Sequence, residues 1–174
     1  MKKIYFTALI IFVIIAVGIL LFCIWRHIQN SVVDKYGMVN ETKVVSAYFD
    51  ESGSMSGAYV RLSAELNEQE NNVDVVIETR DWINNPEERT EYKADESLLD
   101  EVQRVVAESK LISAEKSPIS KDIVLDGATI SVRVYYDDRF NFAVYSNQVL
   151  TDEQAAAMHK IADIIRSEEY KINE

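Results

Sequence analysis

The hydrophobic pattern opens with an apolar run, residues 4–25, that holds 22 residues and no charge. At about 1.5 Å per helical residue the run measures roughly 33 Å, which is enough to cross a hydrocarbon layer about 30 Å thick. A helix is the expected form, because lipid offers backbone groups no hydrogen-bond partners. Tyr5 and Trp25 lie near its two ends, where amphipathic rings prefer the membrane interface. The pattern therefore predicts an N-terminal transmembrane helix.

Two other interpretations of this run stay open, a cleavable signal peptide and a lipid-attached cysteine. The apolar core of a signal peptide usually spans about 7–15 residues and ends at a site of small residues. Small residues occur at 16–18, but the apolar run continues to Trp25. Cys23 follows the bulky Phe22, which fits a lipid-attachment sequence poorly. An uncleaved anchor therefore explains the run best.

The N-terminal flank gives the expected orientation. Lys2 and Lys3 stand directly before the span, and such a short basic tail is typical of a signal-anchor that exports the C-terminal part of its chain. The sequence thus predicts a single-pass protein of the cell membrane, with the transmembrane signal-anchor in residues 1–29. A polar connector at residues 30–43 then leads to an extracytoplasmic domain at residues 44–170.

Beyond the connector, apolar and polar positions alternate with the period of two that is typical of a strand with one solvated face. Residues 58–66 and 73–79 show this pattern, and residues 44–49 are a short β-branched and aromatic run before them; short polar turns join the three segments. Tyr59, Leu62 and Leu66 also fall on helical spacing, so a helix is the alternative for 58–66, but the alternation in 73–79 favours a strand. Three such strands in succession predict an antiparallel meander. Residues 81–93 are polar and contain Asn84-Asn85-Pro86, which predicts a loop.

Two later segments show helical spacing instead. Asp95 is the expected N-cap of a helix that ends near Ser109. A second helix is expected after Thr151-x-x-Gln154, the pattern of a capping box. Their apolar stripes comprise Leu98, Leu99, Val102, Val105 and Val106 in the first helix and Ala157, Met158, Ile161, Ile164 and Ile165 in the second.

Three more short segments between these helices predict a second meander, at residues 123–125, 130–134 and 140–144. Asp126-Gly127 is a strong hairpin signal between the first two of them. The resulting order βββ–α–βββ–α predicts an α+β domain, in which an antiparallel meander sheet carries two helices on one face.

The charge of the domain limits its partners. Residues 30–174 carry all 29 acidic residues and 15 of the 18 Lys and Arg residues, which gives a net charge of −14. A domain this acidic repels phosphate backbones, so the sequence predicts no nucleic-acid partner. The chain's one cysteine, Cys23, lies in the apolar run, which excludes disulfides and cysteine metal sites in the domain.

Asp50-x-Ser52-x-Ser54 is the sharpest local motif. It resembles the metal-ion-dependent adhesion site of von Willebrand factor A domains, where a strand ends in this pattern. A carboxylate and two hydroxyls are suitable oxygen ligands for Mg²⁺. That fold, however, places a long helix after the motif within a doubly wound sheet, whereas a strand is expected here after Gly57. A Gly- and Ser-rich hairpin turn is the simpler explanation.

Other residues with chemical potential do not form a convincing site. His27 lies beside the apolar run and His159 on the last expected helix, so the two histidines are unrelated. Asp137 and Asp138 are adjacent at a turn, where side chains usually point apart. Several tyrosines are expected on strands, where those that share the solvated face could form a binding surface: Tyr48, Tyr59, Tyr135, Tyr136 and Tyr145. The sequence therefore predicts neither catalysis nor a cofactor.

The domain also resembles a family of uncharacterised small envelope proteins from Gram-positive bacteria. The resemblance depends on the order of several short motifs across residues 44–168, which are Gly53-Ser54-Met55-Ser56-Gly57, Thr79-Arg80-Asp81-Trp82, Tyr92-Lys93-Ala94-Asp95-Glu96-Ser97-Leu98-Leu99-Asp100-Glu101, Leu125-Asp126-Gly127 and Tyr145-Ser146-Asn147-Gln148. It implies an α+β domain on a membrane or lipid anchor, and it implies no established activity.

These observations favour a membrane-tethered interaction or structural module of the cell envelope that is not an enzyme and binds an envelope protein. The alternative is divalent-metal-dependent adhesion through Asp50, Ser52 and Ser54. A pilin-like subunit is a third hypothesis, but the glycine and glutamate that pilins carry early in the apolar stretch are absent.

Overall fold

The structure is a computed structural model that describes residues 42–53, 56–120, 128–137 and 140–172. The described residues belong to one folding unit, Thr42–Glu174. Six strands form a single antiparallel sheet: β1 (Val44–Ser52), β2 (Tyr59–Asn67), β3 (Asn72–Arg80), β4 (Glu88–Ala94), β5 (Thr129–Tyr136) and β6 (Asn141–Tyr145). Two α-helices, α2 (Ser97–Glu108) and α3 (Asp152–Arg166), and two short 3₁₀ helices, η1 (Leu111–Lys116) and η2 (Glu168–Tyr170), complete the fold.

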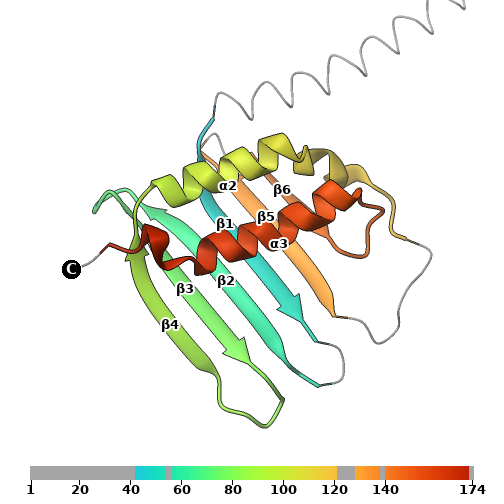
Figure 1. The fold of residues 1–174 in the computed structure, drawn as a ribbon, viewed down its shortest axis with the longest axis horizontal. Coiled ribbons are helices and arrows are strands. Elements are labelled where there is room, and N and C mark those ends of the chain that lie inside the picture. Colours follow the sequence, from blue (N-terminus) through green and yellow to red (C-terminus); the bar gives the residue numbers. More distant parts are fainter. Residues whose placement is uncertain (1–41, 54–55, 121–127, 138–139, 173–174) are drawn as a thin grey trace, which may run out of the picture. The chain divides into compact units, whose positions relative to one another are not determined.

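The strand order across the sheet is β4-β3-β2-β1-β5-β6, so β1 lies near the middle and β4 and β6 form the two edges. The first four strands are a continuous meander, and β5 then pairs with the free side of β1. Figure 1 shows α2 and α3 side by side across one face of this sheet. The domain therefore has two layers.

The core lies between the helices and the sheet. The two helical stripes expected from the sequence are buried in full. On the sheet they meet alternate side chains, among them Phe49, Leu62, Val75, Val132 and Phe142, each at most 2% exposed. Water is excluded from this layer, which accounts for most of the stability that the fold needs.

The ends of the helices confirm one expected cap and shift the other. Thr151 and Gln154 form the capping box of α3. The first helix begins at Ser97 with Glu96 at the N-cap position, one residue later than the sequence predicted. Asp95 still contributes, because its carboxylate accepts a hydrogen bond from the Ser97 backbone N–H at 2.9 Å.

The α+β class and the antiparallel sheet are confirmed, but the strand count before α2 was wrong. Residues 81–93 were expected to be a loop, whereas β4 begins at Glu88. This edge strand has polar residues on both faces, so apolar alternation gives no sign of it. The observed order of described elements is therefore ββββ–α–ββ–α, and the expected strand at residues 123–125 lies outside the described residues.

The predicted transmembrane helix, within residues 1–29, also lies outside the described residues, as does most of the connector. In the part of the chain that the structure describes, no helix is both long enough and apolar enough to cross a membrane.

Candidate functional site

The face of the sheet that points away from the helices is the candidate functional site, and we call it the solvent face. The register places alternate residues of all six strands on it. It has five basic and five acidic side chains: Arg61, Arg80, Arg89, Lys93 and Arg133, and Asp50, Glu65, Asp74, Glu78 and Glu91. The solvent face is thus charge-balanced, although residues 30–174 together carry a net charge of −14.

A row of alternating charges crosses four strands in the middle of this face. Arg89 of β4, Glu78 of β3, Arg61 of β2 and Asp50 of β1 stand directly opposite one another in the register. Arg89 pairs with Glu78, and the Arg61 Nε lies 3.2 Å from the Asp50 Oδ2. Opposite charges on adjacent strands support the register, although each exposed pair contributes only about 0.2–1 kcal/mol.

Beside this row lies an aromatic cluster on β1 and β5. The rings of Tyr48 and Tyr135 meet edge to face with their centroids 5.6 Å apart. The Arg133 guanidinium lies 5.5 Å from the Tyr48 ring centroid, within the range of a cation–π contact. Partial burial, followed by a hydrogen bond with Glu65, raises the pKa of the Tyr48 hydroxyl. Tyr48 therefore stays neutral and able to donate at physiological pH.

The charged row and the aromatic cluster border one shallow depression of about 310 Å³. Its walls include Tyr48, Asp50, Arg61, Glu78 and Arg133. The depression is open to solvent, and most of the residues that line it have polar or charged side chains. A polar or charged side chain of a partner suits such a surface better than a small apolar ligand does.

The end of the sheet near the β1–β2 turn is held together by Tyr59. The guanidinium groups of Arg61 and Arg80 lie over this ring, at 4.5 Å and 4.6 Å from its centroid. Its hydroxyl donates a hydrogen bond to Glu87 in the β3–β4 loop, and this bond raises the pKa of Tyr59. Tyr59 is therefore 8% exposed although it lies on the solvent face.

Two hydrogen bonds to backbone carbonyls also join the β1–β2 and β3–β4 turns. The Ile83 N–H donates to the Ser56 carbonyl at 2.8 Å, and Arg80 Nε donates to the Gly57 carbonyl at 3.1 Å. Gly57 has a φ of +66°, and a Cβ there would lie 2.8 Å from the Ile83 Cβ. Only glycine satisfies both the backbone conformation and this close approach.

The structure places the predicted adhesion-site residues differently from what the motif suggested. Asp50 and Ser52 lie within β1 rather than in a turn after it, because the β1–β2 pairing continues to Ser52 and Tyr59. The Asp50 carboxylate is bonded to Arg61. An antiparallel strand comes next, not the helix of a doubly wound sheet. Ser54 lies outside the described residues, so a ligand set of all three side chains stays a prediction.

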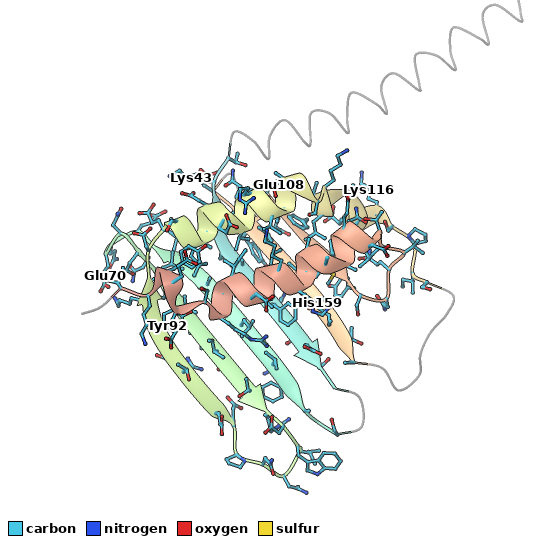
Figure 2. All side chains as sticks on the ribbon, viewed as in Figure 1. Lys43, Glu70, Tyr92, Glu108, Lys116 and His159 are labelled. Carbon is cyan, nitrogen blue, oxygen red and sulfur yellow. The ribbon has the colours of Figure 1, made fainter. Side chains whose placement is uncertain are left out.

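The tyrosines and the histidine that the sequence singled out lie on different sides of the domain. Tyr48, Tyr59, Tyr135 and Tyr145 share the solvent face, whereas Tyr136 is buried under the helices. Figure 2 shows His159 on α3, in the layer opposite the solvent face. Among the described residues no group of three His, Cys, Asp or Glu side chains is arranged to hold a metal ion.

Sequence reasoning missed the charged row itself. Arg61, Glu78 and Arg89 come together only through the pairing of β2, β3 and β4, and the last of these strands had been assigned to a loop. The one available signal was the run of charges in Glu88–Glu91, which alternates poorly with apolar residues but suits an exposed edge.

Comparison with known proteins adds no assignment, because no family model and no curated protein matches this chain. The resemblance to small envelope proteins therefore stays a prediction.

Proposed function

We propose that this chain is a membrane-anchored, non-catalytic interaction module of the cell envelope, and that its solvent face binds a protein partner outside the cytoplasm. The observation that carries the proposal is the contrast between this face and the rest of the domain. The face is uncovered by the described residues, balanced in charge and rich in tyrosine, whereas residues 30–174 carry a net charge of −14.

The chemistry of the face suggests the kind of surface it would meet. Tyrosine and arginine are enriched where proteins contact each other, because both combine large contact area with directional hydrogen bonding. Tyr48, Tyr135 and Arg133 provide such a group beside the depression. A partner with interspersed charges of both signs would match the row from Arg89 to Asp50 without leaving a charge unpaired.

The non-catalytic role is supported by the ion pairs that the charged side chains of the solvent face form with one another. Arg61 engages Asp50, and Arg89 engages Glu78, so these side chains hold one another in place. The histidine that the structure describes, His159, is on the far layer from the serines of the solvent face. In the described part of the chain, the serines of this face therefore have no histidine beside them to act as a base.

The test is site-specific photo-crosslinking in the native membrane with the full chain. A photoreactive residue replaces Ser63, a partly buried serine in the middle of the solvent face. The matched control replaces Ala156, an exposed residue on the outer side of α3. We expect one discrete protein adduct from position 63 and none from position 156.

Two further variants identify the surface. Arg133→Glu removes the guanidinium beside Tyr48 and makes the net charge of the solvent face negative, so the adduct should be lost. Lys160→Glu, on α3, should preserve the adduct. Equal adducts from both faces, or adducts from position 156 alone, would refute the assignment of the binding surface.

A further inference from the structure

The two edges of the sheet are protected to very different degrees. On β4, four of seven residues are charged: Glu88, Arg89, Glu91 and Lys93. The chain's C-terminal segment also pairs with the end of this edge, where the Ile172 N–H donates to the Lys93 carbonyl at 2.9 Å and the Asp95 N–H donates to the Tyr170 carbonyl at 2.8 Å. Charges and an added segment are the usual means of blocking edge-to-edge association.

The opposite edge, β6, carries no charge, and it is capped only at its C-terminal end, where Gln148 bonds both the N–H and the C=O of Tyr145 and the segment at Ile119 pairs with Gln148. Its sequence, Asn141-Phe-Ala-Val-Tyr145, contains no charge and no proline. Among the described strands its only neighbour is β5 (Figure 1). The Tyr145 N–H is bonded to the Gln148 Oε1 at 2.8 Å, so it points outward from the sheet. Because backbone direction alternates along a strand, the N–H and C=O groups of Ala143 and Asn141 also point outward.

Exposed apolar side chains gather beside this same edge. Of the seven large hydrophobic side chains that are exposed in the described residues, four lie here. Tyr145 is on β6, and Tyr135 stands opposite Asn141. Ile119 and Val149 are 62% and 55% exposed, and their segments are joined just beyond the end of β6 by the bond from the Val149 N–H to the Pro118 carbonyl. Among the described residues, the edge is thus open at Asn141 and Ala143 and has exposed apolar side chains beside it.

We infer that two copies of this chain associate by antiparallel pairing of β6 with β6, centred on Ala143, to form one continuous sheet. The outward backbone groups of Asn141 and Ala143 fit this symmetry, and at Tyr145 the Asn141 carbonyl of the second copy would replace the Gln148 side chain as the acceptor of the N–H. Ala143 would face Ala143 of the second copy in a hydrogen-bonded pair, and Asn141 would face Tyr145 of the second copy.

The side chains are compatible with this register. The solvent-face row through the centre would read Arg133, Ala143, Ala143 and Arg133, which keeps the two guanidinium groups apart by two small residues. Tyr145 of each copy would lie beside Asn141 of the other, with Tyr135 next in the row. A similar pairing of β4 would have to displace the C-terminal segment from Lys93 and Ala94. The open edge is therefore the one that a second copy fits.

This inference goes beyond the proposed function, because it uses an edge and not the solvent face. Pairing through β6 would leave the depression between Tyr48 and Arg61 uncovered. It would also place two solvent faces in one surface. The two proposals can therefore fail separately.

The first experiment is cysteine crosslinking of the full chain in its membrane. Cys23, the chain's only cysteine, is replaced by serine in every sample. Ala143→Cys should give a disulfide-linked dimer under mild oxidation, because symmetry brings the two introduced residues together. Thr90→Cys, in the middle of the guarded β4 edge, is the matched control and should stay monomeric. Equal dimer yields from the two variants would overturn the inference.

A charge pair provides the second experiment and controls for folding. Ala143→Glu places a carboxylate opposite Arg133 within one copy but opposite a like charge across the symmetry axis. Ala143→Glu alone and Ala143→Lys alone should each weaken the dimerisation constant by about tenfold or more in quantitative native gels. A tenfold change in this constant corresponds to about 1.4 kcal/mol of binding free energy. Co-expression of the two variants should restore a mixed dimer. Failure of the mixture to dimerise, with photo-crosslinking from Ser63 intact, would refute pairing at β6 and leave the proposed function standing.

Discussion

At the scale of single residues, Gln154 shows how one side chain can fix several elements at once. Its Oε1 accepts the Thr151 N–H at 3.1 Å, and its Nε2 donates to the Lys110 carbonyl at 3.3 Å and to the Ser113 Oγ at 3.0 Å. It is 7% exposed. The same amide therefore caps α3 and ties it to η1, and both of its ends are hydrogen-bonded, as burial of a polar group requires.

This geometry predicts an unusual response at a capping box. Glutamate is normally as suitable as glutamine at this position. Here Gln154→Glu should lower the free energy of unfolding by about 1–3 kcal/mol, because a carboxylate would face the Lys110 carbonyl with no proton to donate. Urea unfolding of residues 42–174 measures the effect. Thr151→Ser retains the hydroxyl and is the control; equal stability of the Gln154→Glu and parent proteins would contradict the prediction.

Asp50 carries a second prediction at this scale. Because Arg61 already occupies its carboxylate, we expect calorimetry of residues 42–174 with Mg²⁺ or Mn²⁺ to detect no binding heat. Asp50→Ala should leave the titration unchanged. Heat that appears with the parent protein and disappears in Asp50→Ala would restore the adhesion-site hypothesis.

At the scale of elements, the start of α2 gives a prediction about pH. Hydrogen bonds from the Ser97 side chain and backbone lower the pKa of Asp95 in the folded state. A carboxyl group with a lowered folded pKa stabilises the protein above its unfolded pKa, near 4, and this contribution is lost as pH falls through the lower folded value. The parent protein should therefore lose stability in this acidic window.

Asp95→Asn isolates the effect, because asparagine retains the accepting oxygen and removes the titrating charge. Its free energy of unfolding should depend less on pH below about pH 4 than that of the parent, by about 1 kcal/mol or less for an exposed cap. Denaturant unfolding of residues 42–174 at a series of pH values measures the difference. Asp100→Asn, in the first turn of α2 but without that backbone hydrogen bond, is the control, and identical pH profiles for parent and Asp95→Asn would contradict the assignment.

The elements also show what the sequence could and could not predict. The stripes of α2 and α3 were identified correctly, because a buried helix face imposes a period that few other structures share. The edge strand β4 was missed because neither of its faces is predominantly apolar. The charged row on the solvent face could not be found from sequence alone, since it depends on the register between strands and not on local spacing. Tyr136 is buried because it continues the alternation of Val132 and Val134, whereas Tyr135 points to the solvent face.

At the scale of the whole molecule, the division of charge connects the proposed anchor with the proposed interface. Residues 1–29 contain three basic residues and no acidic residue, whereas all 29 acidic residues lie beyond them. A domain with a charge of −14 is repelled by anionic lipid headgroups, which would hold the domain as a whole off the bilayer. The solvent face itself carries balanced charge. A charged partner surface would therefore be repelled less by the solvent face than by the acidic remainder of the domain.

The anchor that this argument assumes gives the last prediction. The apolar run should stay in the mature protein, so mass spectrometry of the membrane fraction should find a chain of 19.9 kDa that alkaline carbonate does not extract. Replacement of Ile14 and Ile15 by lysine should release the chain from the membrane or prevent its insertion, because each charge at the centre of a span costs about 2.5–3.5 kcal/mol. Ser31→Lys, in the connector, adds a charge outside the span and should change nothing. A mature chain that begins after residue 18 would instead identify the run as a cleaved signal peptide, and the interaction surface would then act on a released domain.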